Sequence, residues 1–245
     1  MESPVNQSRT PRERRFPSIE RTPRPPSSRS GQRGVARALG TVVGVTSPPP
    51  SATSLILVRH GESEWNAERR IQGHDDTSRL TSLGRAQARD VATALGGLGF
   101  DRLVASDLRR AYETATIIAS TLQLELERDA LLRERSFGAF EGHPGDELTR
   151  EMTGHAAGLV FDGDARPPGG ESLRDVVARA SGFLDRAREE WPGERVLVVT
   201  HGGMINALRL FNSGEPLEGQ PWYRVGNCEV WNLEGPVDLS PHAVT

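Results

Sequence analysis

Two histidines and two arginines stand just after short apolar stretches that lie far apart in the chain. One stretch ends in Arg59-His60, another ends 141 positions later in His201, and Arg110 follows a third. An arginine presents a rigid fork of donors that fits the oxygens of phosphate or carboxylate, and it stays charged at any working pH. Histidine can act as a nucleophile. This set predicts an oxyanion site and, with phosphate as the anion, phosphoryl transfer through a phosphohistidine.

The apolar stretches have the pattern of strands, and they alternate with segments whose apolar residues recur at helical spacing. Such alternation predicts an α/β fold, a three-layer sandwich with a mostly parallel central sheet and helices on both faces. Ligands gather at the carboxyl ends of parallel strands, so the active site is expected at that edge. The expected strands are residues 55–59, 101–106, 195–200 and 228–233, and the expected helices are 81–95, 111–122, 173–191 and 203–211.

The first fifty residues differ from the rest in composition. They hold nine of the 17 prolines and carry a net charge of +6, whereas residues 51–245 carry −9. We predict a disordered Arg/Pro/Ser-rich extension over 1–50, a catalytic domain over 51–238 and a tail over 239–245, because so few apolar residues cannot offset the ordering entropy of the extension. The extension has three interpretations: a dispensable or misassigned start, a transit peptide, and a tail for an anionic partner. The first is favoured because the prolines of residues 23–26 interrupt any targeting helix.

Composition also narrows the chemistry. The chain contains no lysine, which excludes Schiff bases and lysine-based phosphate binding. Its single cysteine, Cys228, excludes an intramolecular disulfide and a cysteine-based zinc site, and it favours a reducing compartment. No run approaches the roughly 18 apolar residues that cross a bilayer. We therefore expect a cytoplasmic protein that binds neither membrane nor nucleic acid.

Seven pieces of sequence follow one another in order through the expected folded portion, and together they resemble the histidine phosphatase superfamily, also called the phosphoglycerate mutase-like family. An Arg-His-Gly tripeptide alone would be a weak signal, but seven ordered pieces are a strong one. The pieces are Leu57-Val-Arg-His-Gly-Glu-Ser-Glu-Trp-Asn66, Arg70-Ile-Gln-Gly73, Leu80-Thr-Ser-Leu-Gly-Arg-Ala-Gln-Ala88, Ser106-Asp-Leu-Arg-Arg-Ala-Tyr-Glu-Thr-Ala115, Leu132-Arg-Glu-Arg-Ser-Phe-Gly-Ala-Phe-Glu-Gly142, Gly169-Gly-Glu-Ser172 and Val199-Thr-His-Gly-Gly203.

The resemblance implies a role for each matching residue. His60 is then the nucleophile that becomes phosphorylated, and Glu134 is the acid that protonates the leaving alkoxide. Arg110 fits the family pattern because it directly precedes Ala111, which leaves Arg109 on the surface. No metal and no cofactor are implied. The residues expected to hold the phosphoryl oxygens are Arg59, Arg110 and His201, with Asn66, Gln72, Gly73 and Gly202 as further substrate-binding residues.

One loop departs from the family pattern. Residues 73–81 are one residue longer than usual and lack the usual proline, so the resemblance does not extend to contacts made by His74 or Arg79. Surface exposure is the expected position of His74, as it is for the other histidines of polar loops, which are His143, His155 and His242.

The family contains phosphatases, in which water removes the phosphoryl group, and mutases, which return it to a bound intermediate. The 26 residues between Gly142 and Gly169 carry five acidic side chains against Arg150 and Arg166. A mutase must retain a doubly phosphorylated intermediate, which requires extra positive charge. We therefore predict a phosphatase whose partner is a small phosphomonoester, such as a sugar phosphate or a phosphorylated carboxylic acid. A phosphoglycerate mutase-type transferase is the alternative.

Two further classes are compatible with some of these residues. A metal-dependent hydrolase would use His60, His201 and Glu134 as ligands, but two arginines in the same pocket repel a divalent cation. A domain that binds a phosphorylated ligand without catalysis is the remoter alternative. None of the patterns encodes the oligomeric state, and a homodimer is compatible with all of them.

Overall fold

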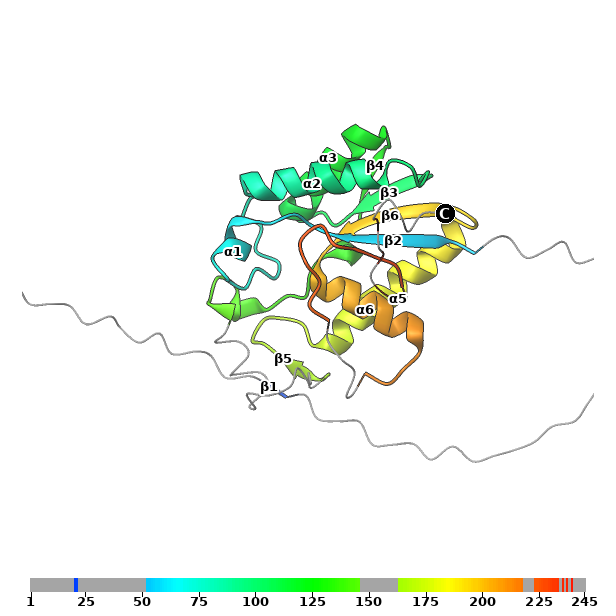
Figure 1. The fold of residues 1–245 in the computed structure, drawn as a ribbon. Coiled ribbons are helices and arrows are strands. Elements are labelled where there is room, and N and C mark those ends of the chain that lie inside the picture. The colour runs from blue at the N-terminus through cyan, green and yellow to red at the C-terminus, as the bar shows by residue number, and fades with distance from the viewer. Residues whose placement is uncertain are drawn as a thin grey trace, which may run out of the picture.

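A five-stranded sheet forms the centre of the fold within the part of the chain that the structure describes (Figure 1). The structure is a computed structural model that describes residues 20–21, 52–145, 163–217, 223–233, 235, 237 and 239. The strand order is β4-β3-β6-β2-β7; the first four strands run parallel and β7 is antiparallel to β2. The strands are β2 (Ser54–Arg59), β3 (Arg102–Ala105), β4 (Leu126–Arg128), β6 (Arg195–Thr200) and β7 (Val230–Trp231).

Helices cover both faces of this sheet, as Figure 1 shows. Alternate side chains of a strand face opposite sides, so Val58 and Val199 enter one apolar core while Leu57 and Val198 enter the other. The first core lies under α2 and α3, and the second lies under α5 and α6. The predicted three-layer α/β sandwich is therefore confirmed. The helices are α2 (Ser82–Leu95), α3 (Arg109–Leu122), α5 (Leu173–Glu190) and α6 (Gly202–Ser213).

Local sequence signals explain where the long helices begin. The Thr81 hydroxyl accepts the N–H of Gly84 at 3.0 Å, and α2 starts at the next residue. Ser172 caps α5 in the same way and shares a capping box with Asp175, whose carboxylate accepts the N–H of Ser172 at 2.7 Å. These side chains satisfy N–H groups that the first turn of a helix leaves without partners. The predicted helix starts are accordingly close to the observed ones.

Short elements were harder to predict than long ones. The sequence prediction had no strand at β4, whose three residues pair only with β3 at the edge of the sheet. The last strand was expected over 228–233 and is only two residues long, because Cys228 has a positive φ of 54° and Asn232 begins a turn. Three brief helical turns complete the elements: α1 (Glu64–Ala67), and the 3-10 helices η1 (Ala130–Leu132) and η2 (Gly138–Phe140).

The amino-terminal extension contributes one short strand. Glu20–Arg21 forms β1, which pairs antiparallel with β5 (Ala165–Arg166). The disordered extension stays a prediction. The rest of the expected extension, residues 1–19 and 22–50, lies outside the described residues. Most of the expected tail does as well.

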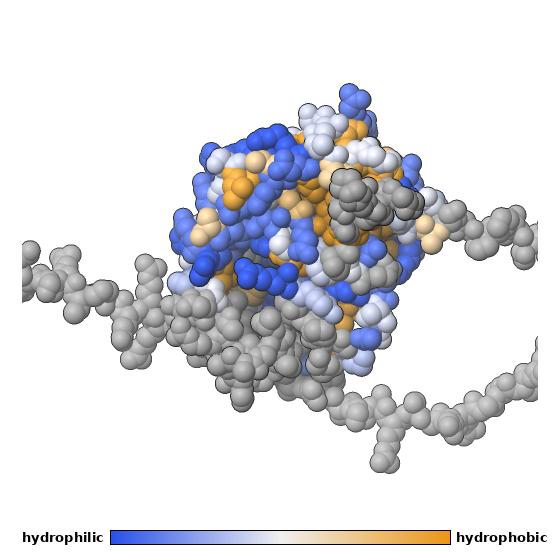
Figure 2. All heavy atoms as spheres, viewed as in Figure 1, coloured by the Kyte–Doolittle hydropathy of each residue, from blue (hydrophilic) through white to orange (hydrophobic). Residues whose placement is uncertain are grey.

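Hydrophilic and apolar side chains are unevenly spread over the face of the molecule seen in Figure 2. Figure 2 shows mainly hydrophilic side chains over the described part of the face in view, with apolar side chains gathered in smaller areas between them. Of the helices in the described part of the chain, none has the length and apolar character needed to cross a membrane.

Close backbone contact fixes the loop after β2 against the start of α2. A Cβ on Gly84 would lie 2.0 Å from the carbonyl oxygen of Glu62, and a Cβ on Gly61 would lie 2.4 Å from the carbonyl oxygen of Gly84. Side chains at either position would push apart two backbone segments that carry the candidate histidine turn. This packing explains physically why the Leu80–Ala88 piece contains a glycine.

Gly84→Ala is expected to destabilise the protein by about 1–3 kcal/mol, because the added methyl group meets backbone that cannot move aside. Gly182→Ala is the matched control, since Gly182 also lies in a helix but its Cβ would approach no atom closer than 4.0 Å, on Leu131. That change should stabilise by about 0.5–1 kcal/mol through helix propensity alone. Urea unfolding of both variants measures the two effects, and equal effects of the same sign would contradict the assignment.

Candidate active site

The two histidines meet because β2 and β6 are parallel neighbours in matching register. Arg59 is paired with Thr200, so His60 and His201 both follow at the carboxyl edge of the sheet. Their ring centroids are 5.2 Å apart with an interplanar angle of 61°. The adjacent strand β3 brings Ser106 to the same edge, where its Oγ lies 2.8 Å from Nε2 of His201. The ends of these three strands therefore bring His60, His201 and Ser106 together at one edge of the sheet.

His60 is oriented as a neutral imidazole with its lone pair on Nε2. Its Nδ1 lies 2.8 Å from the carbonyl oxygen of Gly61, and because a carbonyl only accepts, Nδ1 carries the hydrogen. The side chain is buried, and burial, followed by the charges of Arg110 and Arg59, holds the pKa of His60 well below its ordinary value. Burial and the same two arginines, together with His60, lower the pKa of His201 in the same way. At neutral pH the Nε2 of His60 therefore carries an unprotonated lone pair.

Two buried arginines are held beside these rings by backbone carbonyls. Arg59 donates from Nη1 to the carbonyl of Val225 at 2.7 Å. Arg110 donates from Nη2 to Gly73 at 2.8 Å and from Nη1 to Asp75 at 3.1 Å. Burial lowers the pKa of Arg110 to about 10, with the charge of Glu134 opposing it, so the guanidinium remains charged at neutral pH. Each fork is thereby fixed in place as a cation.

Several donor groups of this site are buried without a partner. Within the described residues, Nε of Arg59, Nε of Arg110 and Nδ1 of His201 are buried and make no hydrogen bond. An unsatisfied buried polar group costs free energy, and native proteins seldom leave one unpaired. Two of these groups belong to arginines whose charges act on both histidines, and the third belongs to His201, so together they have the chemistry of a site for an anion with several oxygens.

Glu134 reaches the same pocket from the chain after η1. Its Oε1 accepts the N–H of Arg135 at 2.9 Å, and its Oε2 accepts the N–H of Gly203 in the first turn of α6 at 3.1 Å. Its charge acts on both Arg59 and Arg110. A Cβ on Gly203 would lie 2.0 Å from Oε1, so only a glycine leaves room for the carboxylate. Gly202, the predicted substrate-binding residue, instead borders the side chain of Arg59.

The other predicted substrate-binding residues support the site from its edge. Asn66 forms a capping box with Ser63 at the start of α1. Gln72 is buried, and its Oε1 accepts the hydroxyl of Ser63 at 2.9 Å. Gly73 has a positive φ of 53° and turns its carbonyl to Arg110. In this structure each of the three fixes a neighbour of the histidine pocket.

Asn227 is a site residue that the sequence prediction missed. Its Nδ2 donates to the carbonyl of His60 at 3.0 Å and to Oδ1 of Asn66 at 3.1 Å, so it ties the nucleophile's backbone to the α1 cap. In the sequence it stands in a Gly-Asn-Cys step that signals only a turn. Its contacts span more than 160 positions, which no local pattern reports.

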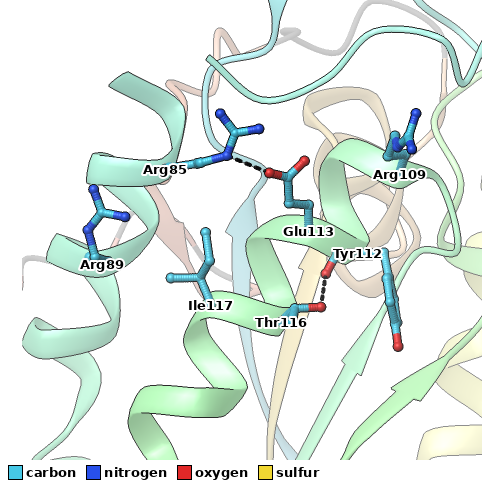
Figure 3. A pocket seen from close by; sticks show the side chains of 7 residues that line it. All are labelled: Arg85, Arg89, Arg109, Tyr112, Glu113, Thr116 and Ile117. Carbon is cyan, nitrogen blue, oxygen red and sulfur yellow. Dashed lines mark hydrogen bonds and ion pairs between the residues drawn. The ribbon is translucent and has the colours of Figure 1, made fainter. Parts of the chain in front are cut away.

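The adjacent arginines separate as expected. Arg110 is 1% exposed, whereas Arg109 is exposed and lines an open groove between α2 and α3 (Figure 3). In that groove Arg85 forms an ion pair with Glu113 at 2.7 Å. Arg109 thus lies on the outer side of α3, and Arg110 faces the pocket beneath the helix.

His74 contradicts its predicted surface position. Its side chain is half-buried, its Nε2 lies 2.8 Å from the carbonyl oxygen of Glu134, and its N–H donates to Glu141. The lengthened loop folds back over the segment of the candidate acid, and polarity alone did not reveal this. His143 is also half-buried. His155, His242 and residues 146–162, most of the segment between Gly142 and Gly169, lie outside the described residues.

The same geometry bears on whether the site could hold a metal ion. In the parts of the chain that the structure describes, no group of three His, Cys, Asp or Glu side chains is placed to hold a metal ion. Glu134 is bonded by two backbone N–H groups, and two guanidiniums share the pocket, so the donor set suits an anion better than a cation.

Comparison with known proteins identifies the family. The family model described as histidine phosphatase superfamily (branch 1) matches residues 55–236. The chain belongs to the histidine phosphatase superfamily. Its relatives include a probable phosphoglycerate mutase, GpmB, of Escherichia coli O1:K1 / APEC, which is 39% identical over 179 residues, 73% of this chain and 83% of the relative. Members of the superfamily are phosphatases or mutases, so the protein is an enzyme of one of these kinds.

Two solved structures of the superfamily resemble this one closely. A mycobacterial glucosyl-3-phosphoglycerate phosphatase in complex with VO3 has a TM-score of 0.66 at 31% identity, covering 74% of this chain and 92% of that chain. A phosphoserine phosphatase from Entamoeba histolytica, in complex with 3-phosphoglyceric acid, has a TM-score of 0.63 at 29% identity, covering 76% and 94%. The histidine phosphatase fold is therefore shared over 74% and 76% of this chain and over 92% and 94% of the two solved chains.

The buried neutral histidines predict how stability depends on pH. Their pKa values in the folded state lie below the unfolded value of about 6.5, so the unfolded chain binds protons that the folded chain does not. The free energy of unfolding should therefore fall as pH decreases below about 6.5, by up to about 1.4 kcal/mol per pH unit for each histidine. Urea unfolding between pH 5 and 8 gives the free energy of unfolding at each pH. Its slope against pH should be smaller in His60→Asn than in wild type by the contribution of one histidine. An unchanged slope would contradict the burial of a neutral imidazole.

Proposed function

We propose that this enzyme is a phosphomonoesterase that hydrolyses a small phosphorylated metabolite through a phosphohistidine on His60, with Glu134 as the proton donor. One observation carries the proposal. The buried ring and guanidinium nitrogens on Arg59, Arg110 and His201 lack partners among the described residues, and all three residues lie near His60: the charges of Arg110 and Arg59 act on it, and the ring centroid of His201 is 5.2 Å away. A phosphoryl group supplies oxygens for these donors and an electrophile for that lone pair.

The first half-reaction transfers the phosphoryl group to the enzyme. Nε2 of His60 attacks phosphorus, the P–N bond forms, and the ester P–O bond breaks. Glu134, in its protonated form, gives its proton to the departing alkoxide, which leaves as an alcohol. The arginine forks stabilise the charge on the equatorial oxygens during transfer.

The second half-reaction restores the enzyme. The Glu134 carboxylate takes a proton from water, the resulting hydroxide attacks phosphorus, and the P–N bond breaks. Inorganic phosphate leaves, His60 regains its lone pair, and Glu134 is again protonated. Fixed positions for nucleophile, forks and acid supply most of what this chemistry requires from a protein.

Hydrolysis is favoured over mutase chemistry by the charge of the segment between Gly142 and Gly169. Its five acidic residues outnumber its two arginines, whereas a bisphosphorylated intermediate needs added positive charge. The two phosphatases with similar structures support the same branch. Because one relative is named as a probable phosphoglycerate mutase, mutase activity is the second candidate function. A sugar phosphate or a phosphorylated carboxylic acid is the proposed substrate class.

His60→Ala and Arg110→Ala are expected to lower kcat/KM for an aryl phosphate strongly, His60→Ala by more than about 1,000-fold. Arg109→Ala is the matched control for Arg110→Ala, since the adjacent guanidinium lies outside the pocket, and it should keep wild-type turnover. Steady-state hydrolysis measures all three. The mechanism is wrong if His60→Ala turns over like wild type.

The same assay separates the alternatives. Full activity in the presence of a chelator is expected, and loss that zinc restores would support a metal-dependent hydrolase. Interconversion of 2- and 3-phosphoglycerate, primed with the bisphosphate, would establish the mutase. Absence of turnover on aryl phosphate and on a panel of metabolite phosphates would favour a phosphate-binding domain without catalysis.

Gly203→Ala is expected to reduce hydrolysis of alkyl phosphates about tenfold or more while affecting aryl phosphates less. The new Cβ displaces the flexible Glu134 carboxylate and leaves the fold intact, and aryl leaving groups need less protonation. Gly202→Ala is the comparison, because its Cβ would lie at an ordinary 3.8 Å from Arg59 and should leave the alkyl-to-aryl ratio nearly unchanged. Glu134→Gln should change the alkyl-to-aryl ratio in the same direction as Gly203→Ala, and by more. A ratio that Glu134→Gln does not alter would remove Glu134 from the role of acid.

A further inference from the structure

Arg179, on α5, binds the backbone of the segment that leads into Glu134. Its Nη1 donates to the carbonyls of Leu131 at 2.8 Å and Arg133 at 3.0 Å, and its Nη2 donates to the carbonyl of Glu134 itself at 3.1 Å. One guanidinium therefore satisfies three carbonyl groups within four residues. No role was predicted for Arg179 from the sequence.

Glu171 fixes the guanidinium of Arg179. Both carboxylate oxygens accept from it, Oε1 from Nε and Oε2 from Nη2, each at 2.8 Å, and each of the two side chains is 19% exposed. Burial raises the pKa of Glu171, but hydrogen bonds from Arg179 and from the N–H of Ser136 outweigh it and hold the pKa below its ordinary value. A charged, bidentate pair of this kind fixes both position and orientation.

The chain after Glu134 is tied to Glu171, both to its carboxylate and to its backbone carbonyl. The N–H of Ser136 donates to Oε2 of Glu171 at 2.9 Å, and Nε of Arg135 donates to the carbonyl of Glu171 at 2.8 Å. On the other side His74 places Nε2 2.8 Å from the carbonyl of Glu134. The peptide of the proton donor is thus held before, at and after the residue.

These bonds matter because Glu134 lies in neither a helix nor a strand. Residues 133–137 have no regular secondary structure, so no ladder of backbone bonds fixes where the carboxyl group lies. A displacement of about 1 Å in a catalytic group is enough to cost about 100-fold in rate. The bonds from Arg179 substitute for the missing secondary structure.

We propose that Arg179 is a positioning residue for Glu134, with Glu171 as its anchor, and that it sets the efficiency of leaving-group protonation. The inference rests on the proposed function, in which Glu134 is the acid. Arg179 touches neither the nucleophile nor the arginine forks in any contact described above. Its loss should therefore affect proton donation and spare phosphoryl binding.

Arg179→Lys tests this, because lysine keeps the charge but lacks the fork that reaches three carbonyls and a carboxylate. We expect kcat/KM, which reports the first half-reaction, to fall about tenfold more on an alkyl phosphate than on a nitrophenyl phosphate. Inhibition by inorganic phosphate should stay within about twofold of wild type. Glu171→Gln, which leaves Arg179 in place but weakens its anchor, should change the alkyl-to-aryl ratio in the same direction by less.

Arg186→Lys is the matched control. Arg186 lies two turns further along α5 and forms an ion pair with Asp129, the N-cap of η1, so it supports the same segment without contacting Glu134. It should lower the unfolding midpoint while keeping the wild-type ratio.

The outcomes are distinct. Equal losses of Arg179→Lys on both esters, or an unchanged ratio in both Arg179→Lys and Glu171→Gln, would show a structural role only and overturn the inference while leaving the proposed function intact. The inference would also be overturned if Arg186→Lys changed the alkyl-to-aryl ratio as much as Arg179→Lys does. Failure of wild type to hydrolyse either ester would instead defeat the proposed function, and the inference with it. If Arg179→Lys does not fold, Glu171→Gln alone decides the result by the same ratio.

Discussion

Two guanidinium groups are buried next to two imidazoles, and the site depends on how the protein tolerates this arrangement. Like charges repel, and burial removes the water that would screen them. The histidines respond by staying neutral, with pKa values far below the ordinary one. The arginines stay charged because the carbonyls of Val225, Gly73 and Asp75 accept from them. An anion with several oxygens would relieve the remaining repulsion between these groups, which supports the proposed phosphoryl site.

The family motifs acquire physical meanings when they are placed in the fold. The glycine at 84 permits the contact between α2 and the loop after β2. Thr114 of α3 accepts the N–H of Gly61 at 3.0 Å and donates to the carbonyl of Arg110 at 2.7 Å, which links the histidine turn to the second arginine. Ser63 and Asn66 close the other side of that turn. Much of what looks like a catalytic signature is therefore the packing that holds one histidine and one arginine still.

Sequence patterns predicted the parts of this structure that depend on residues close together in the chain. Caps at Thr81 and Ser172, apolar periodicity and strand runs placed the long helices and the central strands, because each signal lies within a few residues of what it specifies. The edge strand β4 and the half-buried position of His74 were not predicted, since both are decided by contacts across the chain. The parts played by Gly203, Asn227 and Arg179 escaped for the same reason: each depends on a partner between 45 and 167 positions away. The family resemblance compensated only where a residue carries the chemistry itself.

The proposed nucleophile and the proposed acid are supported mainly from different layers of the sandwich. His60 and Arg110 depend on α2 and α3, through Gly84 and Thr114, on one face of the sheet. Glu134 depends on α5 and α6, through Arg179 and Gly203, on the other. One loop contacts both, since the carbonyls of Gly73 and Asp75 accept from Arg110 while Nε2 of His74 lies 2.8 Å from the carbonyl of Glu134. Apart from that loop, different contacts hold the residues of the proposed phosphoryl site and the proposed acid. In the proposed mechanism, this separation is a physical reason why one phosphohistidine site can serve both phosphatases and mutases, since the phosphoryl cradle is retained while the environment of the acid and the leaving group changes.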